Sequence, residues 1–185
     1  MPRIDVEPDP YSWLMLQPRL GAALLSMADA VYSLANGLPL REREAARMRI
    51  AQLNECQTCQ TTRDTHGAEA GLDEEFYANV AEWRTWEGFT TRERLAAEYA
   101  ERFATDHRAL RDDDDFWRRL RAAYRDDEIV SLAIQTGYYV MAGRSMVVLD
   151  VAQVCMVQVG DAASKLPTRA AVFEAAELAQ PAASQ

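Results

Sequence analysis

Apolar residues recur along this chain three or four positions apart, the spacing of one helix face, and the alternation typical of strands is nearly absent. The first such run opens at Pro18, a favoured first helical residue, and places Leu20, Leu24 and Val31 on one side. Together the runs predict helices at about 18–37, 40–53, 54–71, 72–83, 90–103, 116–126, 129–151 and 168–178. We expect an all-α fold, a compact domain of about six to eight helices.

Capping signals indicate where two of these helices begin. Asn54 followed by Gln57, and Thr90 followed by Glu93, have the spacing of a capping box, in which two side chains satisfy free backbone N–H groups. Asn54 is therefore expected to start the helix that carries two cysteines, and this helix is expected to continue toward Gly71.

The segment 129–151 is apolar on nearly every side, which is typical of a central buried helix, and Gly137 and Gly143 within it indicate close helix packing. Beyond Gly160 the chain is rich in alanine, proline and serine, so at most one short helix and a frayed end are expected there. The predicted organisation is one helical domain at 1–160, with an N-terminal helical extension at 18–37 and a core at 38–151, followed by a tail at 161–185.

Composition and charge exclude several function classes. The formal net charge is −9 and the acidic residues are spread along the chain, which disfavours binding to nucleic acid or to an anionic membrane. No apolar stretch approaches the roughly 18 residues of a membrane helix, and the first residues lack the pattern of a secretory signal, so a cytoplasmic protein is expected. The acidic run Asp112–Asp115 indicates a solvated loop and helix start, because it lacks the glycine and ligand spacing of a calcium loop.

Cys56 and Cys59 form a Cys-x-x-Cys pair, the strongest chemical signal in the sequence. A thiol near a helix N-terminus ionises readily, and a second thiol one turn away can form a disulfide with it, so the pair suits reversible dithiol–disulfide chemistry. Two alternatives are a pair of inert buried cysteines and a zinc site with His66, although zinc lacks a fourth ligand here. Cys155 is expected to be an inert core thiol, and no cofactor or metal is expected.

Three charged or titratable residues could assist this pair. On a continuous helix, Arg63 would share a face with both cysteines and would favour a thiolate. His66 would lie on that face about 10 Å beyond Cys59, too far for a direct hydrogen bond. Glu44 falls on a partly apolar stripe of the preceding helix and could act as a general base or pair with an arginine such as Arg63.

The segment 40–72, LREREAARMRIAQLNECQTCQTTRDTHGAEAGL, resembles the carboxymuconolactone decarboxylase superfamily, specifically its alkylhydroperoxidase D-like branch. The similarity continues through FTTRERLAAEYAERFA and DDEIVSLAIQTGYYVMAGRSMVVLDV and ends near Val151. The signature of this branch is a glutamate, eleven residues, Cys-x-x-Cys, three residues and a histidine. Glu44, Cys56 and Cys59 match it.

The resemblance implies an all-helical homo-oligomer, which could be a dimer, trimer or hexamer, whose cysteine pair reduces a hydroperoxide or exchanges with a disulfide. It implies that Cys59 attacks the peroxide and Cys56 resolves the product, with a glutamate–histidine proton relay. A thiol protein or a dihydrolipoyl-type partner would supply the electrons. Arg144 matches an arginine of the last core helix of the family, for which a structural or interface role is expected.

Arg63 stands where the signature has histidine, and Thr58 stands before the second cysteine, where histidine is common in the family. Because arginine stays protonated, the leaving oxygen of a peroxide would need its proton from water or Glu44. The sequence therefore predicts a thiol–disulfide oxidoreductase rather than a vigorous peroxidase. The alternatives are a non-catalytic or redox-regulated helical protein that lacks the relay, and a cofactor-free decarboxylase or isomerase acting on a small carboxylated lactone.

Overall fold

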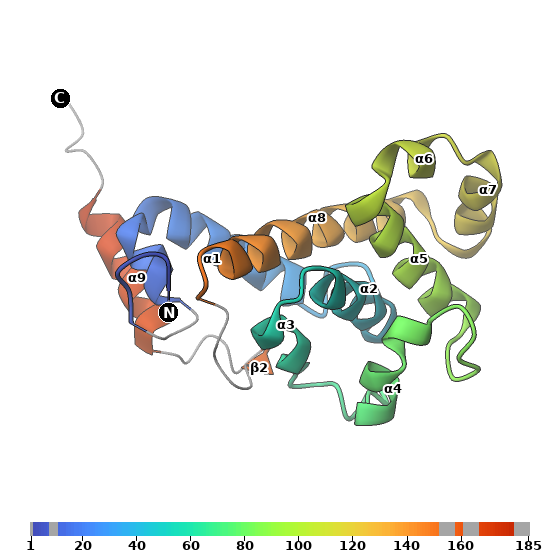
Figure 1. The fold of residues 1–185 in the computed structure, drawn as a ribbon, viewed down its shortest axis with the longest axis horizontal. Helices are drawn as coiled ribbons and strands as arrows, with labels where there is room; N and C mark the ends of the chain where they lie inside the picture. Colours follow the sequence, from blue (N-terminus) through green and yellow to red (C-terminus); the bar gives the residue numbers. More distant parts are fainter. Residues whose placement is uncertain (1, 8–10, 152–157, 161–166, 180–185) are drawn as a thin grey trace.

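The computed structural model describes residues 2–7, 11–151, 158–160 and 167–179. Within them the fold is all-α, as predicted, with nine α-helices rather than six to eight, two short 3₁₀-helices and one two-stranded sheet (Figure 1). No helix of this part of the chain combines the length and the apolar character that a membrane span requires. The elements are η1 Ser12–Leu16, α1 Pro18–Tyr32, α2 Leu40–Leu53, α3 Gln57–Thr61, β1 Arg63–Asp64, α4 Glu74–Ala78, η2 Val80–Glu82, α5 Thr91–Thr105, α6 His107–Arg111, α7 Asp114–Ala123, α8 Asp126–Val148, β2 Gln158–Val159 and α9 Pro167–Leu178.

Helix α2 is the central element of the fold and packs against α5 and α8. Its sequence is rich in arginine and glutamate, yet Glu42, Arg43, Glu44 and Arg47 are all buried. Each of these charges has an oppositely charged partner, which is the condition under which a protein core tolerates ions. Ile50 and other apolar side chains of α2 join the main core cluster with α5 and α8.

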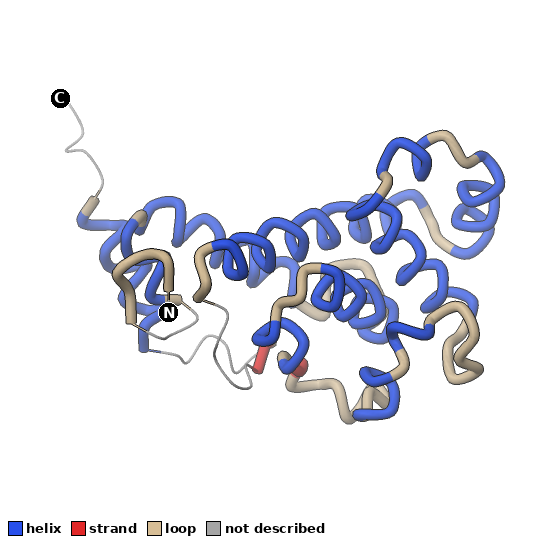
Figure 2. Tube along the Cα trace, viewed as in Figure 1, coloured by secondary structure: helices blue, strands red, loops and turns tan. Residues whose placement is uncertain are grey.

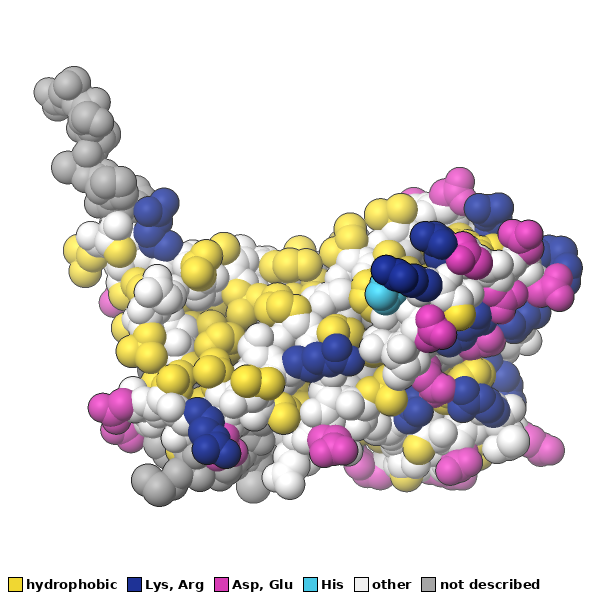
Figure 3. Space-filling view, turned by 45° about the horizontal axis from the view of Figure 1, so that its top comes forward, with side chains coloured by type: hydrophobic (Ala, Val, Ile, Leu, Met, Phe, Trp, Pro, Cys, Tyr) yellow, Lys and Arg dark blue, Asp and Glu magenta, His cyan; other side chains and the backbone are white. Residues whose placement is uncertain are grey.

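The prediction that the segment 129–151 is a central buried helix is wrong in part. Leu132 and Thr136 of α8 are completely buried on the side that faces the core. On the other side, Val130, Ile134 and Val148 are 58%, 54% and 74% exposed. Figure 3 shows a broad apolar area on the upper face of the molecule. Helix α8 therefore has two apolar sides, and within the described part of the chain only the side that carries Leu132 and Thr136 is covered.

Gly143 of α8 permits a close contact, as predicted, whereas Gly137 does not. An added Cβ at Gly143 would lie 2.5 Å from the amide nitrogen of Asn54, while at Gly137 the nearest atom would be 3.9 Å away. The Asn54 amide donates to the carbonyl oxygen of Tyr139 at 3.1 Å and accepts from Nε of Arg144 at 3.0 Å. This contact fastens α8 to the turn after α2.

Helix α9 returns to the beginning of the chain and packs on α1 and η1 (Figure 2). Leu14 of η1, Leu25 of α1 and Val172 of α9 form a separate small apolar cluster. The buried side of α1 is displaced from the predicted one, because Leu25 and Val31 are buried while Leu20 is 71% exposed. The packing of α9 brings a C-terminal helix close to the segment that carries the cysteines.

Candidate active site

Cys56 and Cys59 form a disulfide at the beginning of α3. Cys56 is the N-cap of this helix, and its sulfur accepts a hydrogen bond from the backbone N–H of Cys59 at 3.2 Å. The two Cα atoms lie 5.2 Å apart, a separation that an ordinary disulfide spans.

Two expectations about this segment are wrong. Asn54 ends α2 rather than capping the cysteine helix, and the cysteine helix ends at Thr61 instead of continuing toward Gly71. Glu55 adopts a left-handed backbone conformation with φ 53°, which turns the chain sharply between the two helices. The Thr62 hydroxyl donates to the Thr58 carbonyl oxygen at 2.8 Å and so replaces the backbone bond that a continuing helix would make.

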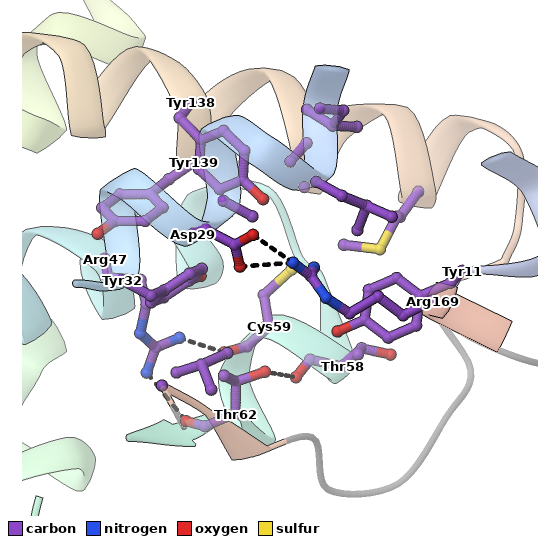
Figure 4. Close-up of a pocket in the computed structure, with 18 of the residues that line it drawn as sticks. Tyr11, Asp29, Tyr32, Arg47, Thr58, Cys59, Thr62, Tyr138, Tyr139 and Arg169 are labelled. Atoms are coloured by element: carbon purple, nitrogen blue, oxygen red, sulfur yellow. Dashed lines mark hydrogen bonds and ion pairs between the residues drawn. The ribbon is translucent and has the colours of Figure 1, made fainter. Parts of the chain in front are cut away.

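The two sulfurs have different surroundings. Cys56 is completely buried, whereas Cys59 is partly exposed and lines a cavity of about 590 Å³. This volume is within the usual range of small-molecule sites, about 300–1,000 Å³. Figure 4 shows the Cys59 side chain among the residues that surround the cavity. A molecule that enters the cavity therefore reaches Cys59.

The walls of the cavity come from α1, α8 and α9 (Figure 4). Tyr32 of α1 and the adjacent Tyr138 and Tyr139 of α8 provide aromatic surface. Asp29 of α1 and Arg169 of α9 form an ion pair there, with Nη2 of the arginine 2.5 Å from each carboxylate oxygen. Burial raises the pKa of Tyr32 to about 12, so this phenol is neutral at physiological pH.

Glu44 makes no hydrogen bond to either cysteine in the described structure. Its buried carboxylate accepts from Nε and Nη2 of Arg47 at 2.9 and 2.8 Å, and from the Tyr77 hydroxyl at 3.1 Å. Arg47 in turn donates to the carbonyl oxygens of Cys59 at 2.6 Å and Thr62 at 3.0 Å. Burial opposes the charge of Arg47, but the charge and hydrogen bonds of Glu44 outweigh it and raise the pKa of the guanidinium. Glu44 thus contacts the cysteine segment through Arg47.

Sequence reasoning did not identify Arg47 as a residue of the site, although its spacing from Glu44 pointed to an ion pair. It follows Glu44 by three positions, a spacing at which side chains of a helix can pair. Its contacts to the cysteine segment depend on the turn at Glu55, which no local pattern indicated.

Arg63 is engaged away from the cysteines. Because α3 ends at Thr61, the helix face that Arg63 would share with the two thiols does not exist. Its guanidinium instead donates to the two carboxylate oxygens of Glu74 at 2.9 and 2.8 Å and lies 3.9 Å from the ring centre of Tyr77. Arg63 thus follows neither of the two alternatives left open for it, facing the thiols or pairing with Glu44, and pairs with Glu74 instead.

His66 lines the same cavity as Cys59. The short parallel pairing of β1 with β2 places Asp64 opposite Val159. The buried Asp64 carboxylate accepts from the His66 backbone N–H at 2.8 Å and lies 3.3 Å from Nδ1 of the ring, while Arg43 pairs with its other oxygen. A carboxylate thus holds the imidazole at the edge of the cavity.

The expectation for the acidic run can be compared with the structure, whereas the one for Cys155 cannot. Cys155 lies outside the described residues. In the acidic run, Asp113 is the N-cap of α7 and accepts from the Phe116 N–H at 2.9 Å, as expected for a helix start. Among the described residues, no group of three histidine, cysteine, aspartate or glutamate side chains is arranged to hold a metal ion.

Comparison with known proteins agrees with the resemblance seen in the sequence. Residues 18–102 match the sequence model of the carboxymuconolactone decarboxylase family, and no curated protein matches the chain. The crystal structure of a protein of unknown function from Agrobacterium tumefaciens, a candidate antioxidant defence protein AhpD, matches with a TM-score of 0.65. That match has 21% sequence identity and covers 85% of this chain and 99% of the other. Residues 18–102, somewhat less than half of the chain, are thus similar to the carboxymuconolactone decarboxylase family, and the chain shares the fold of the Agrobacterium protein.

Proposed function

We propose that this protein is a thiol–disulfide oxidoreductase in which Cys56 and Cys59 alternate between a dithiol and a disulfide and reduce an organic hydroperoxide. One observation carries the proposal: the buried Cys56 is bonded to a Cys59 that opens into a cavity of about 590 Å³. The family match and the fold of the candidate antioxidant protein support the same class of activity.

In the proposed cycle the Cys59 thiolate attacks the outer oxygen of the hydroperoxide and the O–O bond breaks. Cys59 becomes a sulfenic acid, and the leaving alkoxide takes up a proton to give an alcohol. The Cys56 thiolate then attacks the Cys59 sulfur, water leaves after protonation, and the disulfide forms. A thiol protein or a dihydrolipoyl group reduces the disulfide and is itself oxidised by two electrons.

The proton for the leaving oxygen has three candidate sources among the residues predicted for the site. Arg63 stays protonated and pairs with Glu74, and Glu44 is held in a buried ion pair. His66 lines the cavity with Cys59, has one ring nitrogen beside Asp64, and carries an imidazole, the side chain that most often serves as a general acid. We therefore assign His66 as the general acid, and Glu44 with Arg47 as residues that position the Cys59 backbone.

A homo-oligomer is part of the proposal. The exposed apolar side chains of α8 lie beside those of α1, and Met27, Val130 and Ile134 are among them. Contiguous apolar surface of this kind is typical of protein interfaces. A second copy of the chain that covers the face formed by α1 and α8 would remove it from water.

The test is consumption of cumene hydroperoxide with dihydrolipoamide as the electron donor. We expect wild-type protein to consume one hydroperoxide for each dihydrolipoamide, and Cys59→Ser to be inactive. When dihydrolipoamide is left out, Cys56→Ser should consume one equivalent of hydroperoxide and stop with a sulfenic acid on Cys59 that dimedone traps. Full activity in a protein with both cysteines changed to serine would overturn the proposal. A change of oligomer mass with reductant, without hydroperoxide consumption, would favour a redox-regulated scaffold.

A further inference from the structure

The cavity beside Cys59 contains hydrogen-bond donors that the described chain does not satisfy. Arg169 is only 5% exposed, and its contacts with Asp29 use Nη2 alone. Nε and Nη1 of Arg169 make no hydrogen bond within the described residues, and neither atom is sealed from solvent. A nearly buried guanidinium in the cavity wall therefore has two nitrogens available to a ligand.

Two phenols add donors to the same cavity. Tyr32 and Tyr138 both line it, and their hydroxyl groups have no hydrogen-bond partner in the part of the chain that the structure describes. Burial raises the pKa of both side chains, so both keep their protons at neutral pH. Arg169 lines this cavity as well, and Figure 4 shows Tyr138 and the ion pair of Arg169 with Asp29 on its wall.

Unpaired donors in an apolar cavity favour a ligand that carries acceptors. A wholly apolar ligand would bury these donors without partners, which costs binding free energy. A cationic ligand would be repelled by the positively charged guanidinium. A carboxylate offers two anionic oxygens, and it forms strong charge-assisted hydrogen bonds with arginine. The rest of the wall is largely apolar, with Leu24, Leu25 and Met146 among its residues, and the volume leaves room for a ring or a short chain.

We propose that the cavity selects organic hydroperoxides that carry a carboxylate, with Arg169 and Tyr138 binding the carboxylate and the apolar wall holding the remainder against Cys59. The inference rests on the proposed reduction of hydroperoxides. The carboxylate takes no part in the redox step and only holds the substrate. Arg169 belongs to α9, beyond the residues 18–102 that match the family, so this recognition element is a feature of the C-terminal part of the chain.

Asp29 makes it possible to separate substrate binding from a merely structural role of the ion pair. If the pair only fastens α9 to α1, removing either partner should have the same effect. If Arg169 binds a carboxylate, Asp29 places a like charge near the ligand and weakens its binding. Removal of Asp29 should then strengthen the binding of an anionic ligand, whereas removal of Arg169 should weaken it.

The experiment compares cumene hydroperoxide with its para-carboxylated form, two probes that share the reacting group and differ in the carboxylate. Stopped-flow oxidation of reduced protein gives a rate constant for each probe, and their ratio measures the preference. We expect the carboxylated probe to react about tenfold faster or more, as for a hydrogen bond to a charged group. Arg169→Gln should bring the ratio to about one, and Asp29→Asn should raise it.

A ratio near one in wild-type protein, or a preference that survives Arg169→Gln, would overturn the inference while leaving the proposed function intact. Failure of both probes to oxidise the cysteines would instead overturn the proposed function. The para-carboxylated cumyl alcohol, which cannot react, gives an independent readout by calorimetry on the oxidised protein. It should bind wild-type protein about tenfold more tightly than Arg169→Gln. If Arg169→Gln does not fold, the direction of the Asp29→Asn effect decides.

Discussion

Replacing Glu44 by glutamine tests whether this carboxylate positions the cysteine segment or carries protons. Glutamine has nearly the same shape but no charge, so Arg47 would remain buried without its counter-ion. Removing one partner of a buried ion pair costs about 3–5 kcal/mol. We expect the free energy of unfolding of the oxidised protein, measured in urea, to fall by about this amount.

The kinetic expectation for Glu44→Gln follows from the same contacts. Among the described residues, Glu44 is linked to Cys59 only through Arg47, which donates to the Cys59 carbonyl oxygen. The proton for the leaving oxygen would therefore still come from its own source in the variant. We expect the rate constant for oxidation by cumene hydroperoxide to fall by less than about tenfold, with an unchanged pH profile. Loss of a true general acid or base would lower this rate constant about 100-fold or more.

The double variant Glu44→Met, Arg47→Met is the matched control. It removes both charges together, and replacing a buried ion pair by apolar side chains is often neutral for stability. It should therefore be more stable than Glu44→Gln. A Glu44→Gln protein with wild-type stability and a rate reduced about 100-fold would refute the positioning role and indicate a proton relay through glutamate.

Four further predictions concern other parts of the molecule. His66→Gln should slow oxidation by cumene hydroperoxide about 100-fold at neutral pH and remove an inflection from the pH–rate profile; an unchanged profile would exclude His66 as the acid. Gly137→Ala should raise the free energy of unfolding by about 0.5–1 kcal/mol, because the site has room for a methyl group. Gly143→Ala should lower it by about 1–3 kcal/mol, because the methyl group would collide with Asn54. A Gly143→Ala protein that melts at a higher temperature than Gly137→Ala would contradict the close contact at Gly143. Ile134→Glu should reduce the mass measured by light scattering, whereas an unchanged oligomer would place the interface elsewhere. Burial would raise the pKa of Glu101, but hydrogen bonds from an indole and a guanidinium and the charge of Arg49 lower it below its ordinary 4.5. Glu101→Gln should therefore cost stability at pH 7, and this difference should shrink as the pH falls below about 4.5; a constant difference would contradict the assignment.

Features that depend on neighbouring residues could be predicted from the sequence. Thr90 and Glu93 form the expected capping box at the start of α5, because that bond needs only residues three positions apart. The same pattern at Asn54 and Gln57 fails. The Asn54 side chain is used by Tyr139 and Arg144 of α8, a contact between distant segments that overrides the local signal.

The cysteine pair and Glu44 could be found by spacing and resemblance, but their surroundings could not. The burial of α2 depends on charged partners far along the chain, such as Asp64 for Arg43 and Arg92 for Glu42. The position of Arg169 in the cavity likewise depends on the packing of α9 against α1, which has no local signature.

The most direct test of the redox role is a count of thiols after one equivalent of an organic hydroperoxide is added to the fully reduced protein. Alkylation followed by peptide mass spectrometry locates each remaining thiol. We expect the Cys56 and Cys59 thiols to be lost together, as one disulfide, within minutes, while Cys155 is still alkylated. Alkylation of all three cysteines after this treatment would contradict the proposed redox role of the Cys56–Cys59 pair.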